Sequence, residues 1–256
     1  MLHGIFGSGR NWGTVARRLT RARPDWGAVL VDLRGHGGSQ GFAPPHSLGA
    51  AAADLSALAN ALNLPPTAVL GHSFGGKVAL AWADDAPESL NQLWIVDSTP
   101  AAGEPHGSAW EMLGVLRELP ARHADRTEAV QVLEERGIAT PVAQWITTSL
   151  ERTDDGFRWK FDLDTVEALL RDFFATDLWN IVEQPPEGME VHLIKAQESS
   201  VLSGGTLARA QKAQSSGRTF VHTIEGGHWV NADNPDALQD LLMRHLPGVD
   251  RASPRI

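Results

Sequence analysis

The sequence contains no cysteine. Disulfide bonds, catalysis by a thiolate, and zinc or iron–sulfur sites built on cysteine are therefore excluded. A metal site would have to consist of histidine and carboxylate ligands alone, and we expect no metal.

The sequence also lacks a long apolar run. No stretch approaches the roughly 20 residues that span a bilayer, so we expect no membrane span. No basic start followed by an apolar run suggests a signal peptide. We therefore expect a cytoplasmic protein.

Basic residues are in the minority and are not gathered into a stripe. The formal net charge is −9 at pH 7 and the isoelectric point is near 5.5. Binding of phosphate backbones and anionic surfaces depends on clustered lysine and arginine. Nucleic acid and anionic membranes are therefore disfavoured as partners.

The residues that are present suit one α/β domain with an insertion. The 256 residues are 42% hydrophobic and 21% charged, which is ordinary for a globular protein. β-rich runs alternate with helical patterns, as in a parallel sheet with crossover helices. We expect strands at 28–32, 67–71, 92–96, 190–196 and 219–224, and helices at 11–22, 48–62, 75–86, 205–214 and 234–246.

The β signal disappears between residues 100 and 186, where tryptophan and leucine recur at helical spacing. Helices are predicted near 110–116, 127–136 and 165–174. The predicted organisation is a core domain of residues 1–99 and 187–248, a helical cap of residues 100–186 and a flexible tail of residues 249–256.

A serine flanked by glycines follows the expected strand 67–71, where residues 71–77 read Gly-His-Ser-Phe-Gly-Gly-Lys. Gly-x-Ser-x-Gly between a strand and a helix forces a sharp turn, which strains the serine backbone and exposes its hydroxyl. Gly71 and Gly75 leave room where strand and helix pass closely. The helix N-terminus favours negative charge at the same point. We therefore predict that Ser73 is a nucleophile and not a plain turn serine.

A serine hydroxyl needs a base, and imidazole is the side chain suited to that role near neutral pH. His228, in Gly226-Gly-His-Trp-Val230, lies between the last expected strand and the last helix. Loops at the carboxyl ends of parallel strands face one crevice, so we predict that His228 is the base. Strand alternation predicts that His72 points elsewhere and packs, and we interpret His36 as a turn residue.

The base needs a carboxylate partner to hold its tautomer, and two candidates compete. Asp97 directly follows the strand 92–96, and Glu198 follows the strand 190–196. We favour Asp97, and the other carboxylate is then a solvated loop residue.

A tetrahedral intermediate also needs backbone N–H donors, one from the residue after the serine, Phe74, and one from another loop. Residues 2–8, Leu-His-Gly-Ile-Phe-Gly-Ser, are expected to form that loop. A dinucleotide loop is the alternative, but residues 7–13 have the wrong final spacing and follow no strand. We therefore expect no cofactor.

These stretches resemble the α/β-hydrolase superfamily, and within it small bacterial carboxylesterases and their mitochondrial relatives. The likeness covers nearly the whole chain and includes His3-Gly4, Asp32-Leu-Arg-Gly-His-Gly-Gly-Ser39, Gly71-His-Ser-Phe-Gly-Gly-Lys77, Val96-Asp-Ser-Thr-Pro100 and Gly226-Gly-His-Trp-Val230. It implies the α/β-hydrolase fold, a mostly parallel sheet flanked by helices with a helical cap insertion.

The resemblance also implies functional residues. It assigns the nucleophile to Ser73, the base to His228, and the two N–H donors to the backbone of Ile5 and Phe74. In many members the acid follows the strand matching 190–196, at a position that reads Ser200 here. Members with an aspartate at the end of the preceding strand support Asp97.

Members of the superfamily run two or three strands before the His-Gly pair, and this sequence has none. We therefore expect N-terminal strands to be missing from the sheet, with a raw edge beside the site.

The leading hypothesis is a serine hydrolase that cleaves small-molecule carboxylic esters or thioesters of short to medium acyl chains. Carbon–carbon bond hydrolases, lyases and acyltransferases use the same triad and stay as alternatives, as does a ligand receptor without catalysis. Eight apolar side chains of residues 100–186 are candidates either for an acyl pocket or for the core of the cap: Trp110, Leu113, Leu116, Trp145, Ile146, Phe173, Phe174 and Trp179.

Overall fold

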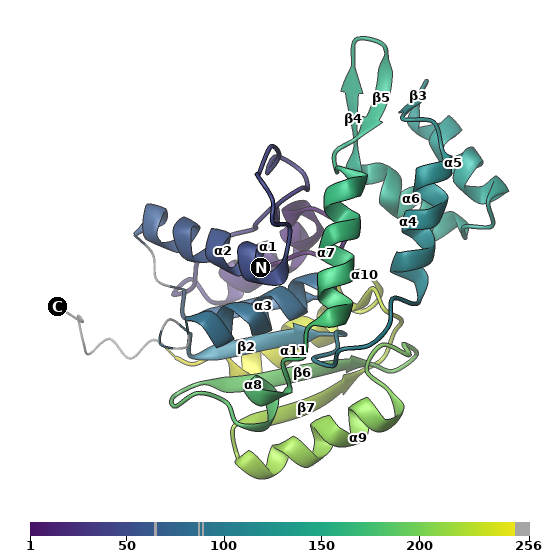
Figure 1. The fold of residues 1–256 in the computed structure, drawn as a ribbon. Helices are drawn as coiled ribbons and strands as arrows, with labels where there is room; N and C mark the ends of the chain where they lie inside the picture. Colours follow the sequence, from purple (N-terminus) through teal and green to yellow (C-terminus); the bar gives the residue numbers. More distant parts are fainter. Residues whose placement is uncertain (64–65, 87, 89, 249–256) are drawn as a thin grey trace.

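The computed structural model describes residues 1–63, 66–86, 88 and 90–248. Its centre is a four-stranded sheet in the order β1-β2-β6-β7, and every neighbouring pair is parallel. The strands are Ala68–His72, Gln92–Val96, Glu190–Ala196 and Thr219–Ile224. Helices lie between them along the chain (Figure 1). The expected α/β class and four of the five expected strands are confirmed.

The core helices agree with the expected ranges to within two residues. They are α1 (Gly13–Ala22), α2 (Leu48–Leu62), α3 (Phe74–Asp85), α9 (Gly204–Ala213) and α11 (Pro235–His245), with the short helices η1 (Gly9–Trp12), η4 (Gln214–Ser216) and α10 (Val230–Asp233) beside them. Local capping explains the bounds: Ser47 accepts from the Ala50 N–H at the start of α2, and Asn234 accepts from Ala237 at the start of α11. None of the described helices combines the length and apolar character needed to cross a membrane. The cytoplasmic location stays a prediction.

Alternating side chains of the sheet divide the core into two faces. On β2, Trp94 and Val96 pack with buried residues of α1 and α11. Leu93 and Ile95 point to the other face, into a larger cluster with α3 and the segment 100–186. All four side chains are fully buried.

The expected strand at 28–32 is wrong. Val31 forms only an isolated bridge with Leu2, which also bridges to Gly71 at the end of β1. A β-branched segment forms a strand only where a neighbouring segment pairs with several of its residues. Here Leu2 is the single residue that pairs with the segment, so no ladder forms. Val29 and Leu30 stay 45% and 36% exposed.

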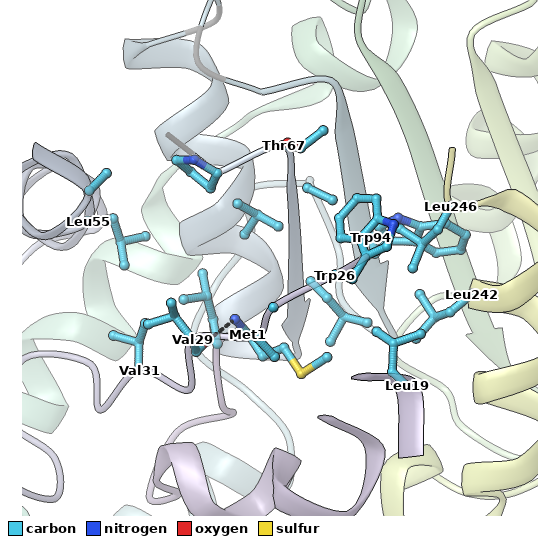
Figure 2. A pocket seen from close by; sticks show the side chains of 18 of the residues that line it. Met1, Leu19, Trp26, Val29, Val31, Leu55, Thr67, Trp94, Leu242 and Leu246 are labelled. Atoms are coloured by element: carbon cyan, nitrogen blue, oxygen red, sulfur yellow. Dashed lines mark hydrogen bonds between the residues drawn. The ribbon is translucent and has the colours of Figure 1, made fainter. Parts of the chain in front are cut away.

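An apolar cavity of about 810 Å³ lies between this segment and the edge of β1 (Figure 2). Met1 lines the cavity, and its amino group donates to the Val29 carbonyl at 2.8 Å. Its lining includes no residue of the predicted nucleophile, base and acid. The cavity is therefore separate from the predicted site.

The segment 100–186 contains the three expected helices and more. It folds into α4 (Ser108–Glu118), α5 (Arg126–Glu135), α6 (Thr140–Ile146), η3 (Thr147–Ser149), α7 (Leu163–Ala175) and α8 (Trp179–Glu183). Helices α4 to α7 lie together on one side of the main sheet (Figure 1). The division into core and cap stays a prediction, and the tail expected at 249–256 lies outside the described residues.

The absence of β structure expected in this segment is wrong. An antiparallel sheet in the order β3-β5-β4 is formed by Arg122–His123, Gly156–Trp159 and Leu150–Thr153. The turn between β4 and β5 uses Gly156 at φ 124°, a backbone region that other residues rarely adopt. Strands of two to four residues are too short to show a clear alternating pattern.

Three histidines surround Trp94 on the face covered by α11. The His192 ring stacks on Trp94 at 4.0 Å between centroids, and its Nδ1 lies 3.0 Å from Nε2 of His222. His245 packs against both histidines. Burial lowers the pKa of His192 and of His222 to about 4. Among the described residues no three histidine or carboxylate side chains are grouped to hold a metal ion.

These lowered pKa values predict acid sensitivity. Between pH 6.5 and about 4, these histidines bind protons in the unfolded chain but stay neutral in the folded protein. The free energy of unfolding therefore falls as pH falls. Each such histidine contributes at most about 1.4 kcal/mol per pH unit. His192→Phe, which keeps the stacking, should give a shallower fall in urea denaturation between pH 7 and 5. The exposed His106→Gln serves as the control, and an unchanged slope in His192→Phe would contradict the prediction.

Candidate active site

Ser73 lies in the turn between β1 and α3 with φ 51° and ψ −117°, a strained backbone for a residue with a side chain. Its N–H donates to the Val96 carbonyl at 2.9 Å. A Cβ on Gly71 would lie 2.1 Å from the Gly75 oxygen, and one on Gly75 would lie 2.5 Å from the His3 oxygen. The sharp turn and its need for glycine are therefore as the sequence predicted.

The Ser73 side chain is partly exposed. Its Oγ makes no hydrogen bond within the described part of the chain. The hydroxyl is therefore not committed to a structural partner.

His228 is held by Asp97. Nδ1 of His228 lies 2.7 Å from Oδ2 of Asp97, whose side chain is fully buried while that of His228 is 23% exposed. The other Asp97 oxygen accepts from the Ala196 N–H at 3.2 Å. Because a carboxylate only accepts, Nδ1 carries the proton, and Nε2 of the neutral ring has a free lone pair.

Glu198 is not part of this pair. Its backbone N–H donates to the Gly226 carbonyl at 3.0 Å, and its side chain is exposed. The structure therefore joins His228 to the carboxylate favoured from the sequence and leaves the alternative on the surface. Ser200 is also exposed.

His72 does not point away from the site, so that expectation is wrong. Its Nε2 lies 2.7 Å from the His228 carbonyl, and the two rings are 4.6 Å apart. Strand alternation selects a face of the sheet, but the loop that carries His228 covers that face. Burial, with His228 nearby, lowers the pKa of His72 to about 3, so the neutral ring donates from Nε2. This bond ties the His228 loop to the residue before Ser73.

The two expected N–H donors are unoccupied. The backbone N–H groups of Ile5 and Phe74 have no hydrogen-bond partner within the described residues. Phe74 is the first residue of α3, where such a group is normally free. Both residues are buried, at 5% and 1% exposure, so two unpaired donors remain in a region with little water.

Two buried histidines hold the loop that carries Ile5. His36 Nε2 accepts from the Phe6 N–H at 3.1 Å, and His3 Nε2 accepts from the Leu33 N–H at 2.9 Å. Each Nδ1 lies within hydrogen-bond distance of a nearby backbone carbonyl. Burial lowers the pKa of His3 to about 3 and of His36 to about 4, so both rings are neutral and can accept.

This reciprocal pair goes beyond the turn role expected for His36. Phe6 has φ 63°, and its carbonyl also accepts from Ser149 Oγ at 2.7 Å. The strained residue after Ile5 is thus held on both sides. The sequence showed His3 and His36 within their motifs, but their pairing depends on two loops that meet only in the fold.

Six of the eight apolar candidates of the segment 100–186 are buried in the common core, including Phe173 and Phe174, while Trp110 and Trp145 are partly buried against it. The other four buried candidates are Leu113, Leu116, Ile146 and Trp179. Trp145 contacts Trp229, the neighbour of His228, at 4.0 Å between ring centroids. Phe173 lies 6.2 Å from the ring of Phe74. Only part of the set therefore approaches the site.

Comparisons with known proteins cover nearly the whole chain. A model described as the alpha/beta hydrolase family matches residues 1–241. The sn-1-specific diacylglycerol lipase ABHD11 of Mus musculus is 28% identical, over 96% of this chain and 79% of that protein. Esterase YbfF of Escherichia coli (strain K12) is 27% identical, over 96% of this chain and 91% of that protein. A solved structure of a marine microorganism esterase has a TM-score of 0.82 at 25% identity, over 96% and 93% of the two chains.

Proposed function

We propose that this chain, which belongs to the alpha/beta hydrolase family, hydrolyses carboxylic esters and thioesters with Ser73 as nucleophile, His228 as base and Asp97 as acid. The fold expected from the resemblance and the expected enzyme class, a carboxylesterase-type hydrolase, are confirmed by the family match and the relatives. The observation that supports the residue roles is the 2.7 Å contact between His228 and the buried Asp97, on a loop tied to the serine turn.

The first half of the reaction transfers the acyl group to the enzyme. Nε2 of His228 takes the Ser73 proton while Oγ attacks the ester carbonyl, and Asp97 stabilises the imidazolium. The oxygen that becomes negative accepts from the free N–H groups of Ile5 and Phe74. His228 then protonates the leaving alcohol or thiol, which departs.

The second half uses water in place of the alcohol. His228 takes a proton from water, hydroxide adds to the acyl carbonyl, and the proton returns to Ser73 Oγ as the carboxylic acid leaves. The Ser73 hydroxyl is unbonded in the free protein, and such contacts tighten when substrate binds. His3 and His36 act as positioning residues, because their bonds hold the Ile5 loop before the charge develops.

We also propose that residues 100–186 form a cap that limits the acyl chain. Lys77 on α3 donates to the carbonyls of Ala101 at 2.8 Å and Phe173 at 2.5 Å, which attaches the segment near Ser73. The rings of Phe173 and Trp145 then stand beside Phe74 and Trp229. Bulky aromatic walls leave room for short to medium acyl chains.

Ser73→Ala tests the nucleophile. Loss of the attacking oxygen should lower kcat/KM for p-nitrophenyl butyrate by about 10⁴-fold or more. Ser200→Ala, an exposed serine after β6, should hydrolyse the ester as the wild type does. A fluorophosphonate probe should label the wild type and Ser200→Ala but not Ser73→Ala. Undiminished turnover in a folded Ser73→Ala protein would refute the proposed role.

Asp97→Asn compared with Glu198→Gln tests the acid. An asparagine can stabilise the wrong imidazole tautomer, so kcat should fall by about 10³- to 10⁴-fold. Glu198→Gln should stay within about twofold, because that side chain is exposed and does not contact His228. The reverse order of effects would assign the acid to Glu198.

A series of p-nitrophenyl esters from acetate to palmitate tests the acyl range. We expect kcat/KM to peak between about two and eight carbons, because the proposed limit on the acyl chain is the pair of rings Phe173 and Trp145, which contact Phe74 and Trp229. Trp145→Ala should move the optimum to longer acyl chains. The control is Leu116→Val at a fully buried position, which should lower the free energy of unfolding and leave the optimum acyl length unchanged. Highest activity on palmitate in the wild type would rule out the proposed limit.

A further inference from the structure

A cavity of about 410 Å³ lies between the loop after the Ile5 turn and the small sheet of the segment 100–186. We call it the Arg10 pocket, and its lining consists of Arg10, Arg126, Thr148, Leu150, Glu151, Arg152, Phe157 and Lys160. Four cationic side chains thus face one carboxylate, in a chain whose net charge is −9. The local charge has the opposite sign to that of the whole molecule.

The positive charges of the pocket are not cancelled. Arg10 and Arg152 are exposed and have no ion pair among the described residues. Arg126 donates to the Leu150 carbonyl at 3.1 Å and its guanidinium lies 5.8 Å from the Phe157 ring, contacts that hold it without neutralising it.

Glu151, the single acidic lining residue, is already engaged. It accepts from Arg158 at 2.8 Å and lies 4.0 Å from Lys160. A concave surface with four cations and one shared carboxylate attracts anions more strongly than scattered surface charges do. Arginine forks match carboxylate and phosphate oxygens in particular.

The pocket is connected to the proposed active site through the chain neighbours of its lining residues. Arg10 lies on η1, which directly follows the loop of residues 2–8. On the opposite wall, Thr148 precedes Ser149, whose Oγ bonds the Phe6 carbonyl at 2.7 Å. Next to Arg10, the Asn11 carbonyl accepts from Asn231 of α10, which follows the His228 loop. Chain neighbours of two lining residues, Arg10 and Thr148, are therefore bonded to the loop that carries Ile5 and to the helix after the His228 loop.

We propose that the Arg10 pocket binds an anionic group, a carboxylate or a phosphate, at the far end of the ester or thioester whose carbonyl meets Ser73. This inference rests on the proposed function and names its substrate class, which is an acidic ester in place of a neutral one. The pocket is large enough for either anion, and Phe157 offers an apolar wall to the chain that carries it.

Two matched substrate pairs test the proposal. Mono-p-nitrophenyl glutarate is compared with p-nitrophenyl butyrate for a carboxylate, and S-butyryl phosphopantetheine with S-butyryl pantetheine for a phosphate. The wild type should prefer the anionic member of at least one pair, and the pair that responds identifies the anion.

The Arg10→Ala/Arg152→Ala double variant should raise KM for the preferred anionic substrate about tenfold and leave the neutral ester within twofold. Arg17→Ala, an exposed arginine on α1 outside the pocket, removes a charge elsewhere and should change neither. A wild type without preference in either pair, or equal losses on charged and neutral substrates, would overturn the inference. Ser73→Ala distinguishes a failure of this inference from a failure of the proposed function. If that variant retained hydrolysis, the proposed function itself would be wrong.

Discussion

The hydrogen bond between His228 and Asp97 is the interaction on which the proposed chemistry depends. A carboxylate with no exposure to water is stable only if both oxygens find donors, and here Nδ1 of His228 and the Ala196 N–H supply them. The bond joins the ends of β2 and β6 to the loop after β7. It also fixes the tautomer, because a proton held on Nδ1 leaves Nε2 as an acceptor for the Ser73 proton.

Neutral histidines hold the surrounding loops in place. His72 bonds the His228 carbonyl, while His3 and His36 each accept an N–H from the loop that carries the other. Burial keeps all three rings uncharged, with pKa values of about 3, 4 and 3 for His3, His36 and His72. An imidazole can donate and accept at once only in this neutral form. The same burial that positions the loops therefore makes them sensitive to acid.

The charge around one cavity is opposite in sign to the net charge of the protein. The sequence is acidic, and its arginines are dispersed along the chain without a basic run. Folding nevertheless brings Arg10, Arg126, Arg152 and Lys160 around one cavity. Net charge describes long-range attraction to partners, but the anion that a site accepts depends on which side chains the fold places together. A search for clustered basic residues in the sequence could not find this pocket.

The sequence by itself determined the features that obey local rules. The turn at Ser73 follows from clashes that a Cβ on Gly71 or Gly75 would make, and the helix bounds follow from nearby caps such as Ser47. Tertiary structure decided the rest, because each remaining choice depended on a distant neighbour. The segment 28–32 lacked a ladder partner, the carboxylate favoured from the sequence, Asp97, had a competitor in Glu198, and His72 met a loop far along the chain. Steric constraints between neighbouring residues can be predicted from the sequence. A contact between remote segments forms only after the sheet has set their positions.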